Sequence, residues 1–295
     1  MGDPIGTIAA LWRYPVKSMQ GEALEEAFLT ERGVLGDRAY AVIDVATGHV
    51  ASAKHPRKWA GLFACRAAFT EPPAPGGALS DVRITLPDGT IVSSADAAVH
   101  RELSRVVGRE VRLVAQTAHS GDRLVREADR TPLDATEGTT VVREEPLALA
   151  AASDSFVDVA PLHLLTTATL EHLGTLAPAS RFEPRRFRPN VLVRPATNAA
   201  RTTTTGFVEN DWLGLTLAAG EARISVNDPC PRCVVTTLAV DDLPQDPAVL
   251  RAIVRANAVA SRTVAPGVVF AGVVGVYAAV ARVGAVHRDA PLYAC

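Results

Sequence analysis

The sequence is poor in cysteine and in aromatic residues, and its charges nearly balance. The 295 residues include only four cysteines, and Phe, Trp and Tyr together make up 5% of the chain. Four scattered thiols are too few for a disulfide-stabilised fold, and so few aromatic rings argue against a surface on which bases or sugars stack. Lys and Arg number 30 against 32 Asp and Glu, a formal net charge of −2. The chain therefore lacks the broad basic surface of a nucleic-acid-binding protein.

No secretion signal and no membrane span are predicted. The N-terminal stretch, MGDPIGTIAALWRYPVKS, does not have the basic segment followed by an apolar one that a signal peptide shows. The uncharged stretch 263–281 is about as long as a spanning helix, but it is rich in valine and interrupted by proline and glycine. Two short buried strands fit this composition better. We therefore expect a reduced, cytoplasmic protein.

What remains is the composition of a chain that folds into a packed structure. Hydrophobic residues make up 48% and charged residues 21%, which excludes wholesale disorder, and the length favours two domains. Short runs with alternating apolar residues predict strands at 5–12, 39–45, 49–53, 82–86, 91–92, 190–193, 222–226 and 234–240. Many short strands with few helices favour barrel-like β domains rather than a doubly wound α/β sheet. The predicted fold class is mainly β with peripheral helices.

Capping residues predict a few helices between these strands. They are expected at 96–107, where Asp96 caps and Gly108 follows, at 166–173, where Gly174 follows, and after Asp246 and Pro247. The stretches 71–80 and 117–146 show no stable period and predict irregular connections. We take the second as the boundary between an N-terminal unit, residues 1–125, and a C-terminal unit, residues 140–290.

The sharpest local motif is CPRC, which places Cys230 and Cys233 at the end of a predicted strand. A structural zinc site needs four ligands, generally from two such pairs, and Cys65 and Cys295 are single and remote. A dithiol redox pair needs its first cysteine at a helix N-terminus, whereas the residues that follow favour a strand. A third possibility is one thiolate that binds a soft metal while other groups complete its coordination. The neighbouring Arg232 favours the thiolate form.

Cationic and hydroxyl residues stand close to several predicted strands. Lys17 and Ser18 follow the first strand, Arg38 precedes the next, and Arg188 lies in a basic turn that leads into another. Threonines begin the predicted helix at 166–173, where free backbone N–H groups favour anions. Each of these alone is more often a surface charge or a cap. Together they supply the groups that hold a phosphorylated cofactor with a metal.

Familiar hydrolase and nucleotide-binding signatures do not occur. The sequence has no H-E-x-x-H, G-x-S-x-G or Walker motif, so a zinc hydrolase, an α/β-hydrolase and a P-loop enzyme are unsupported. The seven histidines are dispersed along the chain. Of these, His163 and His172 flank the helix predicted at 166–173, and we interpret both as structural.

Taken in order, several motifs resemble those of one family. YPVKS, GVLGDRAYAVID and SAKHPRKWAGL resemble the β-barrel domain that precedes MOSC domains, and RFRPNVLV, ENDW and DPCPRCVVTT resemble the MOSC domain itself. The family includes the C-terminal domain of molybdenum-cofactor sulfurase and the mitochondrial amidoxime-reducing component. The resemblance covers residues 5 to 288. It implies an N-terminal β-barrel-like domain followed by a MOSC β-barrel.

The resemblance also implies a pyranopterin-dithiolene molybdenum cofactor between the two domains. It assigns the metal to Cys233, the second cysteine of the family's motif. It assigns cofactor binding to Lys17, Ser18, Arg38, Thr166, Thr169, Arg188 and Asn190. Pyridoxal phosphate binding is a further association at the level of the family. This sequence departs from the family pattern at Met19, at Asn210 and in the closing turn at 286–290.

The function implied by the resemblance is molybdenum-dependent reduction of N-oxygenated compounds such as hydroxylamines and amidoximes. Two alternatives stay open: a sulfur-handling protein that carries a persulfide or performs C–S chemistry on Cys233, and a cofactor carrier without turnover. The four cysteines do not have the spacing of a plant-type [2Fe–2S] site, and no G-x-G-x-x-G element offers a nicotinamide or flavin site. We therefore expect electrons from a separate ferredoxin, flavodoxin or b-type cytochrome with its reductase.

Overall fold

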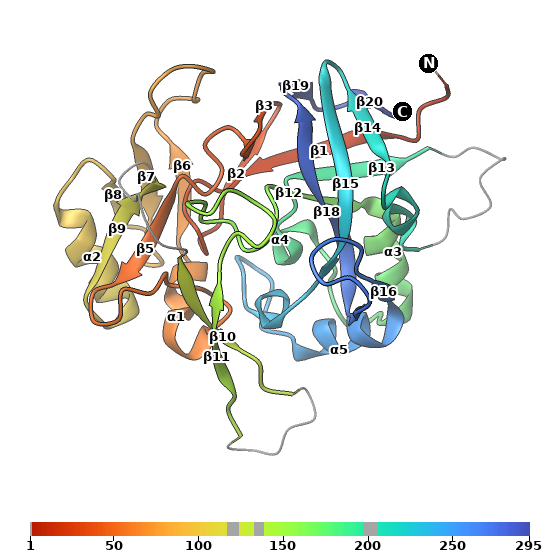
Figure 1. The fold of residues 1–295 in the computed structure, drawn as a ribbon. Helices are drawn as coiled ribbons and strands as arrows, with labels where there is room; N and C mark the ends of the chain where they lie inside the picture. The colour runs from red at the N-terminus through yellow and green to blue at the C-terminus, as the bar shows by residue number, and fades with distance from the viewer. Residues whose placement is uncertain (1, 117–123, 133–138, 197–205) are drawn as a thin grey trace.

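The computed structural model describes residues 2–116, 124–132, 139–196 and 206–295, and strands form most of its regular structure (Figure 1). The strands are β1 (Gly6–Arg13), β2 (Glu22–Leu24), β3 (Glu26–Thr30), β4 (Gly33–Val34), β5 (Tyr40–Asp44), β6 (Arg66–Phe69), β7 (Val82–Thr85), β8 (Ile91–Ser93), β9 (Val111–Ala115), β10 (Val125–Asp129), β11 (Val142–Pro146), β12 (Leu162–Thr166), β13 (Val191–Pro195), β14 (Thr216–Ala219), β15 (Ala222–Pro231), β16 (Ala258–Ala260), β17 (Val269–Ala271), β18 (Val273–Arg282), β19 (Gly284–His287) and β20 (Pro291–Ala294). The α-helices are α1 (Pro56–Phe63), α2 (Ala98–Val107), α3 (Thr167–Leu176), α4 (Pro184–Phe187) and α5 (Pro247–Ala256), and the 3₁₀ helices are η2 (Val208–Trp212) and η3 (Val234–Thr237). The predicted fold class, mainly β with few helices, is confirmed.

Seven strands close into a barrel. Their order is β13-β12-β18-β15-β14-β20-β1, and β1 pairs back onto β13. The pair β12–β13 is parallel, and its connection contains α3 and α4, because parallel neighbours need a long crossover. Aliphatic side chains such as Ile8, Leu164 and Ile224 fill the interior. The β-barrel expected from the many short strands is therefore present.

The first strand of the chain belongs to this barrel. β1 pairs with β13 through Thr7 and Arg194, and with β20 through Gly6 and Leu292. The barrel thus takes a strand from the segment that the predicted division assigns to the N-terminal unit. That division, at 125 and 140, stays a prediction.

The N-terminal half forms a second body of small sheets with two helices, at the left of Figure 1. Strand β5 pairs with β9, and β6, β7 and β8 form another sheet. Helices α1 and α2 cover them and bury Trp59 and Leu103. Helix α2 begins where Asp96 Oδ1 accepts a hydrogen bond from Ala98 N at 2.7 Å, and it ends at Gly108 in the left-handed conformation, as the sequence predicts.

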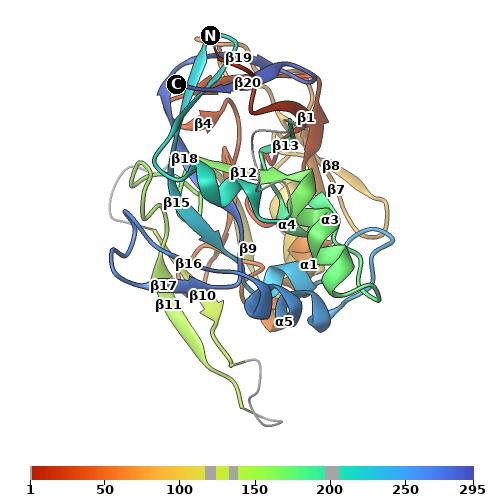
Figure 2. The ribbon, with the colours of Figure 1, turned by 90° about the vertical axis from the view of Figure 1, so that its right-hand side faces the viewer.

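Helices α3 and α5 pack beside the barrel (Figure 2). Each begins at a side-chain cap: Thr166 Oγ1 accepts from Thr169 N, and Asp246 Oδ1 accepts from Ala248 N at 2.9 Å. Both helix starts are as predicted. Helix α3 continues through Gly174 to Leu176, beyond its predicted end.

Three stretches differ from their predictions. The strand predicted at 49–53 does not form, because Val50 makes only isolated bridges, to Ile43 and Arg126. The stretch expected to be an irregular connection contains the hairpin β10–β11, which projects from the body in Figures 1 and 2. Its cross-strand partners are charged, as in Arg126 and Glu145, so apolar alternation gives no signal there. The segment after the CPRC motif forms η3 instead of a strand, because Thr236 N and Oγ1 both donate to Cys233 O.

The apolar stretch 263–281 forms the strands β17 and β18, as predicted, but β17 is largely exposed and β18 is ten residues long, so they are not two short buried strands. In the part of the chain that the structure describes, no helix is long and apolar enough to cross a membrane.

The two halves meet along a mixed interface. Phe63 of α1 packs with Leu238 and Val240, which follow η3. Beside this apolar contact, the Arg66 guanidinium binds both Asp241 oxygens at 2.9 and 3.0 Å. The interface fixes residues from both halves around one pocket.

Candidate functional site

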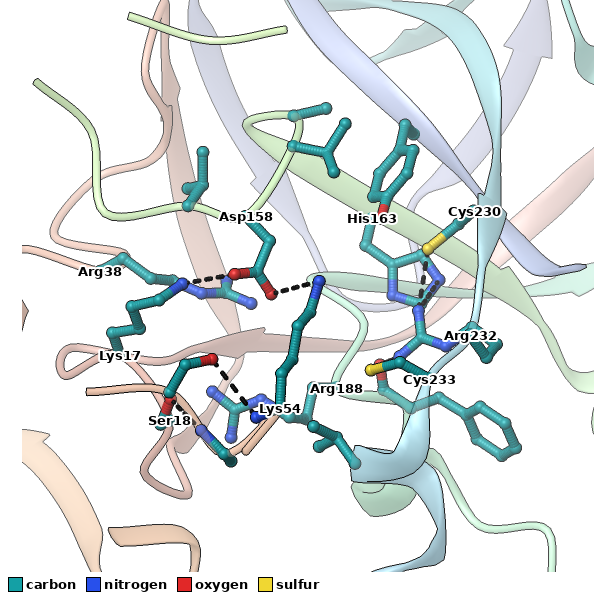
Figure 3. A pocket seen from close by; sticks show the side chains of 18 of the residues that line it. Lys17, Ser18, Arg38, Lys54, Asp158, His163, Arg188, Cys230, Arg232 and Cys233 are labelled. Carbon is teal, nitrogen blue, oxygen red and sulfur yellow. Dashed lines mark hydrogen bonds and ion pairs between the residues drawn. The ribbon is translucent and has the colours of Figure 1, made fainter. Parts of the chain in front are cut away.

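One pocket collects side chains from both halves of the molecule (Figure 3). It contains about 790 Å³ of space, including the part open to solvent. The described residues that line it are Lys17, Ser18, Arg38, Ser52, Ala53, Lys54, Phe63, Val157, Asp158, Val159, Ala160, His163, Phe187, Arg188, Asn190, Cys230, Pro231, Arg232, Cys233, Val235 and Tyr277. Five of these are Lys or Arg and one is a carboxylate, so the pocket carries an excess of positive charge.

The first part of the pocket is the turn that follows β1. Ser18 has a left-handed backbone with φ 66°, and its Oγ accepts a hydrogen bond from Ala53 N at 3.0 Å. The Lys17 ammonium is buried and donates to Asp158 Oδ1 at 2.6 Å and to Phe156 O at 2.9 Å. Burial lowers the pKa of Lys17 to about 7, although Asp158 opposes the shift. This turn therefore ties together three segments that are far apart in sequence.

The second part of the pocket is a pair of guanidinium groups that lie against one aromatic ring. The guanidinium carbons of Arg38 and Arg188 lie 4.7 and 4.2 Å from the centre of the Tyr14 ring. Arg38 also binds Asp37, and Arg188 donates to Met19 O. Burial, followed by the charge of Arg38, lowers the pKa of Arg188 to about 10. Both guanidinium groups add to the positive charge of the pocket, and a guanidinium group suits an oxyanion.

The third part of the pocket is the CPRC turn at the end of β15. Arg232 Nη1 donates to Cys230 Sγ at 2.8 Å, and Nη2 donates to Phe187 O at 2.6 Å. Both cysteines line the pocket, but Cys230 is buried, whereas Cys233 is half-buried. Arg232 thus fixes the turn, and Cys233 is the thiol of this turn that is open to a ligand. Within the described ranges, no three His, Cys, Asp or Glu side chains are grouped to hold a metal ion.

His163 lies in the wall of the pocket near Arg232. Its backbone N donates to Asn190 Oδ1 at 3.2 Å, and its Nε2 lies 3.1 Å from Val274 O. Burial, and then the charge of Arg232, lowers the pKa of His163 to about 3, so the ring is neutral. A Cβ at Gly275, where φ is 82°, would lie 2.2 Å from His163 Nε2, so the ring occupies space that only glycine leaves free.

The predicted site residues divide into two groups. The structure brings Lys17, Ser18, Arg38, Arg188, Asn190 and Cys233 to one pocket. Thr166 and Thr169 are not among the described residues that line it. Their hydroxyls donate to the buried Glu209 Oε2 at 2.6 and 2.7 Å. This placement differs from the expectation, because Glu209 already satisfies the start of α3.

Sequence reasoning missed Lys54 and Asp158. Both line the pocket, and Lys54 Nζ lies 3.4 Å from Asp158 Oδ2. Lys54 stands inside the motif SAKHPRKWAGL, so the resemblance to a family motif was the available signal. Asp158 stands before β12 in a stretch without periodicity, and no local pattern marks it. His163, interpreted from the sequence as structural, also lines the pocket.

Comparison with known proteins identifies both parts of the chain. The MOSC N-terminal beta barrel domain family matches residues 5–71, and the MOSC domain family matches residues 152–293. The mitochondrial amidoxime reducing component 2 of Rattus norvegicus is 25% identical over 246 residues, which cover 80% of this chain and 68% of the rat protein.

Solved structures give a weaker likeness. The YUAD protein of Bacillus subtilis aligns over 97% of this chain and 93% of its own, with a TM-score of 0.41 and 10% identity. YiiM of Geobacillus stearothermophilus aligns over 59% of this chain and 73% of its own, with a TM-score of 0.31 and 16% identity. The assignment rests on the two domain families, which occur in order along the sequence. The chain belongs to the MOSC family, with a MOSC N-terminal beta barrel domain followed by a MOSC domain.

Proposed function

We propose that the pocket binds a pyranopterin-dithiolene molybdenum cofactor and that the protein reduces N-oxygenated compounds such as amidoximes or hydroxylamines. The observation that carries this proposal is the half-buried Cys233 thiol in a pocket whose described lining has five cations and one carboxylate. A thiolate suits a soft metal, and guanidinium groups suit phosphate. The name of the rat relative, amidoxime reducing component, supports the class of substrate.

The residues of the pocket fit this cofactor. Cys233 would hold the metal. Lys17, Arg38 and Arg188 would bind phosphate and pterin oxygens through charge-assisted hydrogen bonds. The side chains of Ser18 and Asn190 are engaged by Ala53 N and His163 N, so we assign these two residues to positioning the turns that carry the cations.

The cofactor, when bound, supplies two-electron oxygen-atom transfer. The residues of the chain bind the cofactor and orient the groups around it. Arg232 holds the CPRC turn through Cys230 Sγ and Phe187 O, and His163 presents a neutral ring because its pKa is about 3. The Lys17 ammonium donates to Asp158 and to Phe156 O, and we assign this lysine to anion binding through its third N–H.

A separate protein supplies the electrons in this proposal. Cys65 is buried in the N-terminal core, and Cys295 is exposed beyond β20, so the four thiols do not gather into an iron–sulfur site. Turnover should therefore need a redox partner or a chemical reductant, and its rate with a protein partner should fall as ionic strength rises. NAD(P)H alone should give no turnover.

The test begins with the full chain made in a host that synthesises the cofactor. Molybdenum and pterin content are measured first, followed by reduction of a panel of N-hydroxylated compounds with a reduced viologen. Bound zinc without molybdenum or pterin would overturn the proposal. Molybdenum without turnover would favour a carrier, and one added sulfur on Cys233 after incubation with a desulfurase would favour a sulfur-handling protein.

A further inference from the structure

Asp158 is the centre of an ionic cluster in the pocket wall. Its Oδ1 lies 2.6 Å from Lys17 Nζ and 3.0 Å from Arg126 Nη1, and its Oδ2 lies 3.4 Å from Lys54 Nζ. The three cations come from the turn after β1, from β10 and from the segment before α1. Burial opposes ionisation of Asp158, but the charges of Arg126, Lys17 and Lys54 hold its pKa well below the ordinary value. Asp158 thus faces three cations, one of which, Arg126, is also paired with Glu145.

The cations of this cluster are not fully satisfied. Arg126 is only 2% exposed, yet its Nε has no hydrogen-bond partner among the residues that the structure describes, and its Nη1 is within ion-pair distance of Asp158 without hydrogen-bond geometry. Its Nη2 binds Glu145 Oε2 at 2.9 Å. Buried donors that lack a partner are costly. The cluster therefore has capacity for a further oxygen ligand.

Asp158 is also the most accessible member of the cluster. About a third of its side chain, 35%, is exposed, against 5% for Lys17, 14% for Lys54 and 2% for Arg126. An anion that enters the pocket can therefore approach this carboxylate as well as the cations. Because like charges in a site of low dielectric repel strongly, the anion and the carboxylate compete for the same ammonium and guanidinium groups.

We infer that Asp158 is the internal counter-ion of a phosphate-binding subsite in which Lys17 and Lys54 line the pocket and the buried Arg126 adds positive charge behind them, and that an entering oxyanion takes the two lysines over from it. The inference rests on the proposed function for the natural occupant, the phosphate of a bound cofactor. Lys54 thereby becomes an anion-binding residue, and Asp158 lowers the affinity of the subsite for any anion that enters.

The test is a calorimetric titration of the full chain, made in a host unable to synthesise the cofactor, with inorganic phosphate. Asp158→Asn should bind phosphate at least tenfold more tightly than wild type, which corresponds to about 1.4 kcal/mol. Asp154→Asn is the matched control, because it neutralises a carboxylate of the same loop that binds Arg32 on the surface. Its phosphate affinity should stay within about twofold of wild type.

A second pair of variants locates the subsite. Lys54→Gln should weaken phosphate binding about tenfold, since a charge-assisted contact is lost. Arg57→Gln removes the same charge three residues away, from an exposed side chain outside the pocket lining, and should leave the affinity unchanged. Equal effects of both variants would show general electrostatics and overturn the subsite.

Thermal unfolding separates a counter-ion from a merely structural carboxylate. Asp158→Asn should unfold at a lower temperature than wild type in chloride and recover in phosphate of equal ionic strength. Equal destabilisation in both salts, or an unchanged phosphate affinity, would overturn the inference. The molybdenum content of protein from a cofactor-making host is measured separately, so failure of the proposed function is recognised independently.

Discussion

The two ends of β12 each have a carboxylate beside them, and the two carboxylates are held in opposite ways. Before the strand, Asp158 lies among cations and faces the pocket. At its far end, Glu209 accepts hydrogen bonds from Thr166 Oγ1, Thr169 Oγ1 and Gly275 N, at 2.6, 2.7 and 3.1 Å. Burial raises the pKa of Glu209, whereas the cations hold the pKa of Asp158 well below its ordinary value despite burial.

The difference separates a structural carboxylate from one in a binding site. The donors around Glu209 are neutral and fixed by α3 and β18, and the carboxylate is fully buried. Because these donors are already engaged by Glu209, they are not available to bind a ligand. The partners of Asp158 are charged groups in the wall of the pocket. A second anion can bind the same cations together with Asp158 or in its place. The free N–H groups of a helix start, taken alone, do not make a binding site.

The largest expected effect is at the pocket. Cys233→Ser should abolish turnover and release the metal, because a serine oxygen is a poor replacement for a soft thiolate. Loss of a residue behind a metal ligand typically costs about 10- to 100-fold, so loss of the ligand should cost more. Activity and molybdenum content of the purified variant are the measurements.

Cys230→Ser is the matched control, since Cys230 is buried and bonded to Arg232. It should lower activity about tenfold or less and keep the metal. Complete loss in both variants would instead indicate a shared dithiol or zinc role.

The next effect is at the other end of β12, and it concerns stability alone. Glu209→Ala leaves the Thr169 hydroxyl and the Gly275 N–H without their acceptor in the core, at about 1–3 kcal/mol each, whereas Thr166 Oγ1 can still donate to Thr169 Oγ1. We expect a loss of at least ~2 kcal/mol in the free energy of unfolding, measured by urea denaturation. Turnover per bound molybdenum should be unchanged. A selective loss of turnover at full stability would break the comparison, because it would place Glu209 in the site.

Local signals predicted much of the fold, because they act over a few residues. Asp96 with Gly108, and Asp246 with Pro247, mark helix ends through their own backbone chemistry. Closure of the barrel by β1 and β13 joins residues such as Thr7 and Arg194, which no local pattern connects. The charged hairpin β10–β11 was hidden because its strands pair through ions and not through apolar side chains.

The site was predictable where residue type carries the chemistry. Lys17, Arg38, Arg188 and Cys233 are cations and a thiol beside strands, and all four line the pocket. Asp158 pairs with a lysine 141 positions away, so its role depends on the tertiary fold. The threonines of α3 resemble an anion site in sequence, and the glutamate that satisfies Thr166 lies 43 positions later.

A smaller effect tests the guanidinium pair on Tyr14. Arg38→Ala should weaken cofactor retention by about 1.5–3 kcal/mol, the value of a hydrogen bond to a charged group. Pterin content per chain should fall before turnover per bound molybdenum does. Arg32→Ala, which removes an exposed guanidinium paired with Asp154, is the control. Full pterin occupancy with no turnover would assign Arg38 to the substrate instead.

The smallest expected effect is the pH dependence of the free energy of unfolding that Glu209 contributes. Because burial raises the pKa of Glu209 above its ordinary value, the folded state holds this proton more tightly than the unfolded state does. Stability from this group is complete below the unfolded pKa of about 4.3 and is lost as pH rises through the folded pKa. Glu209→Gln cannot titrate, so its deficit against wild type should shrink as pH rises between the unfolded and the folded pKa, by about 1.4 kcal/mol per pH unit.

A second buried carboxylate, Asp228, should give a pH dependence of stability with the opposite sign. Asp228 accepts hydrogen bonds from the backbone N–H groups of Arg262, Thr263 and Val264. Burial opposes its ionisation, but these bonds lower its pKa, so its contribution is present above the unfolded pKa and is lost as pH falls through the folded one. The deficit of Asp228→Asn should therefore shrink as pH falls. Urea denaturation of both variants across pH measures the two slopes, and slopes of the same sign would contradict the opposite pKa directions of Glu209 and Asp228.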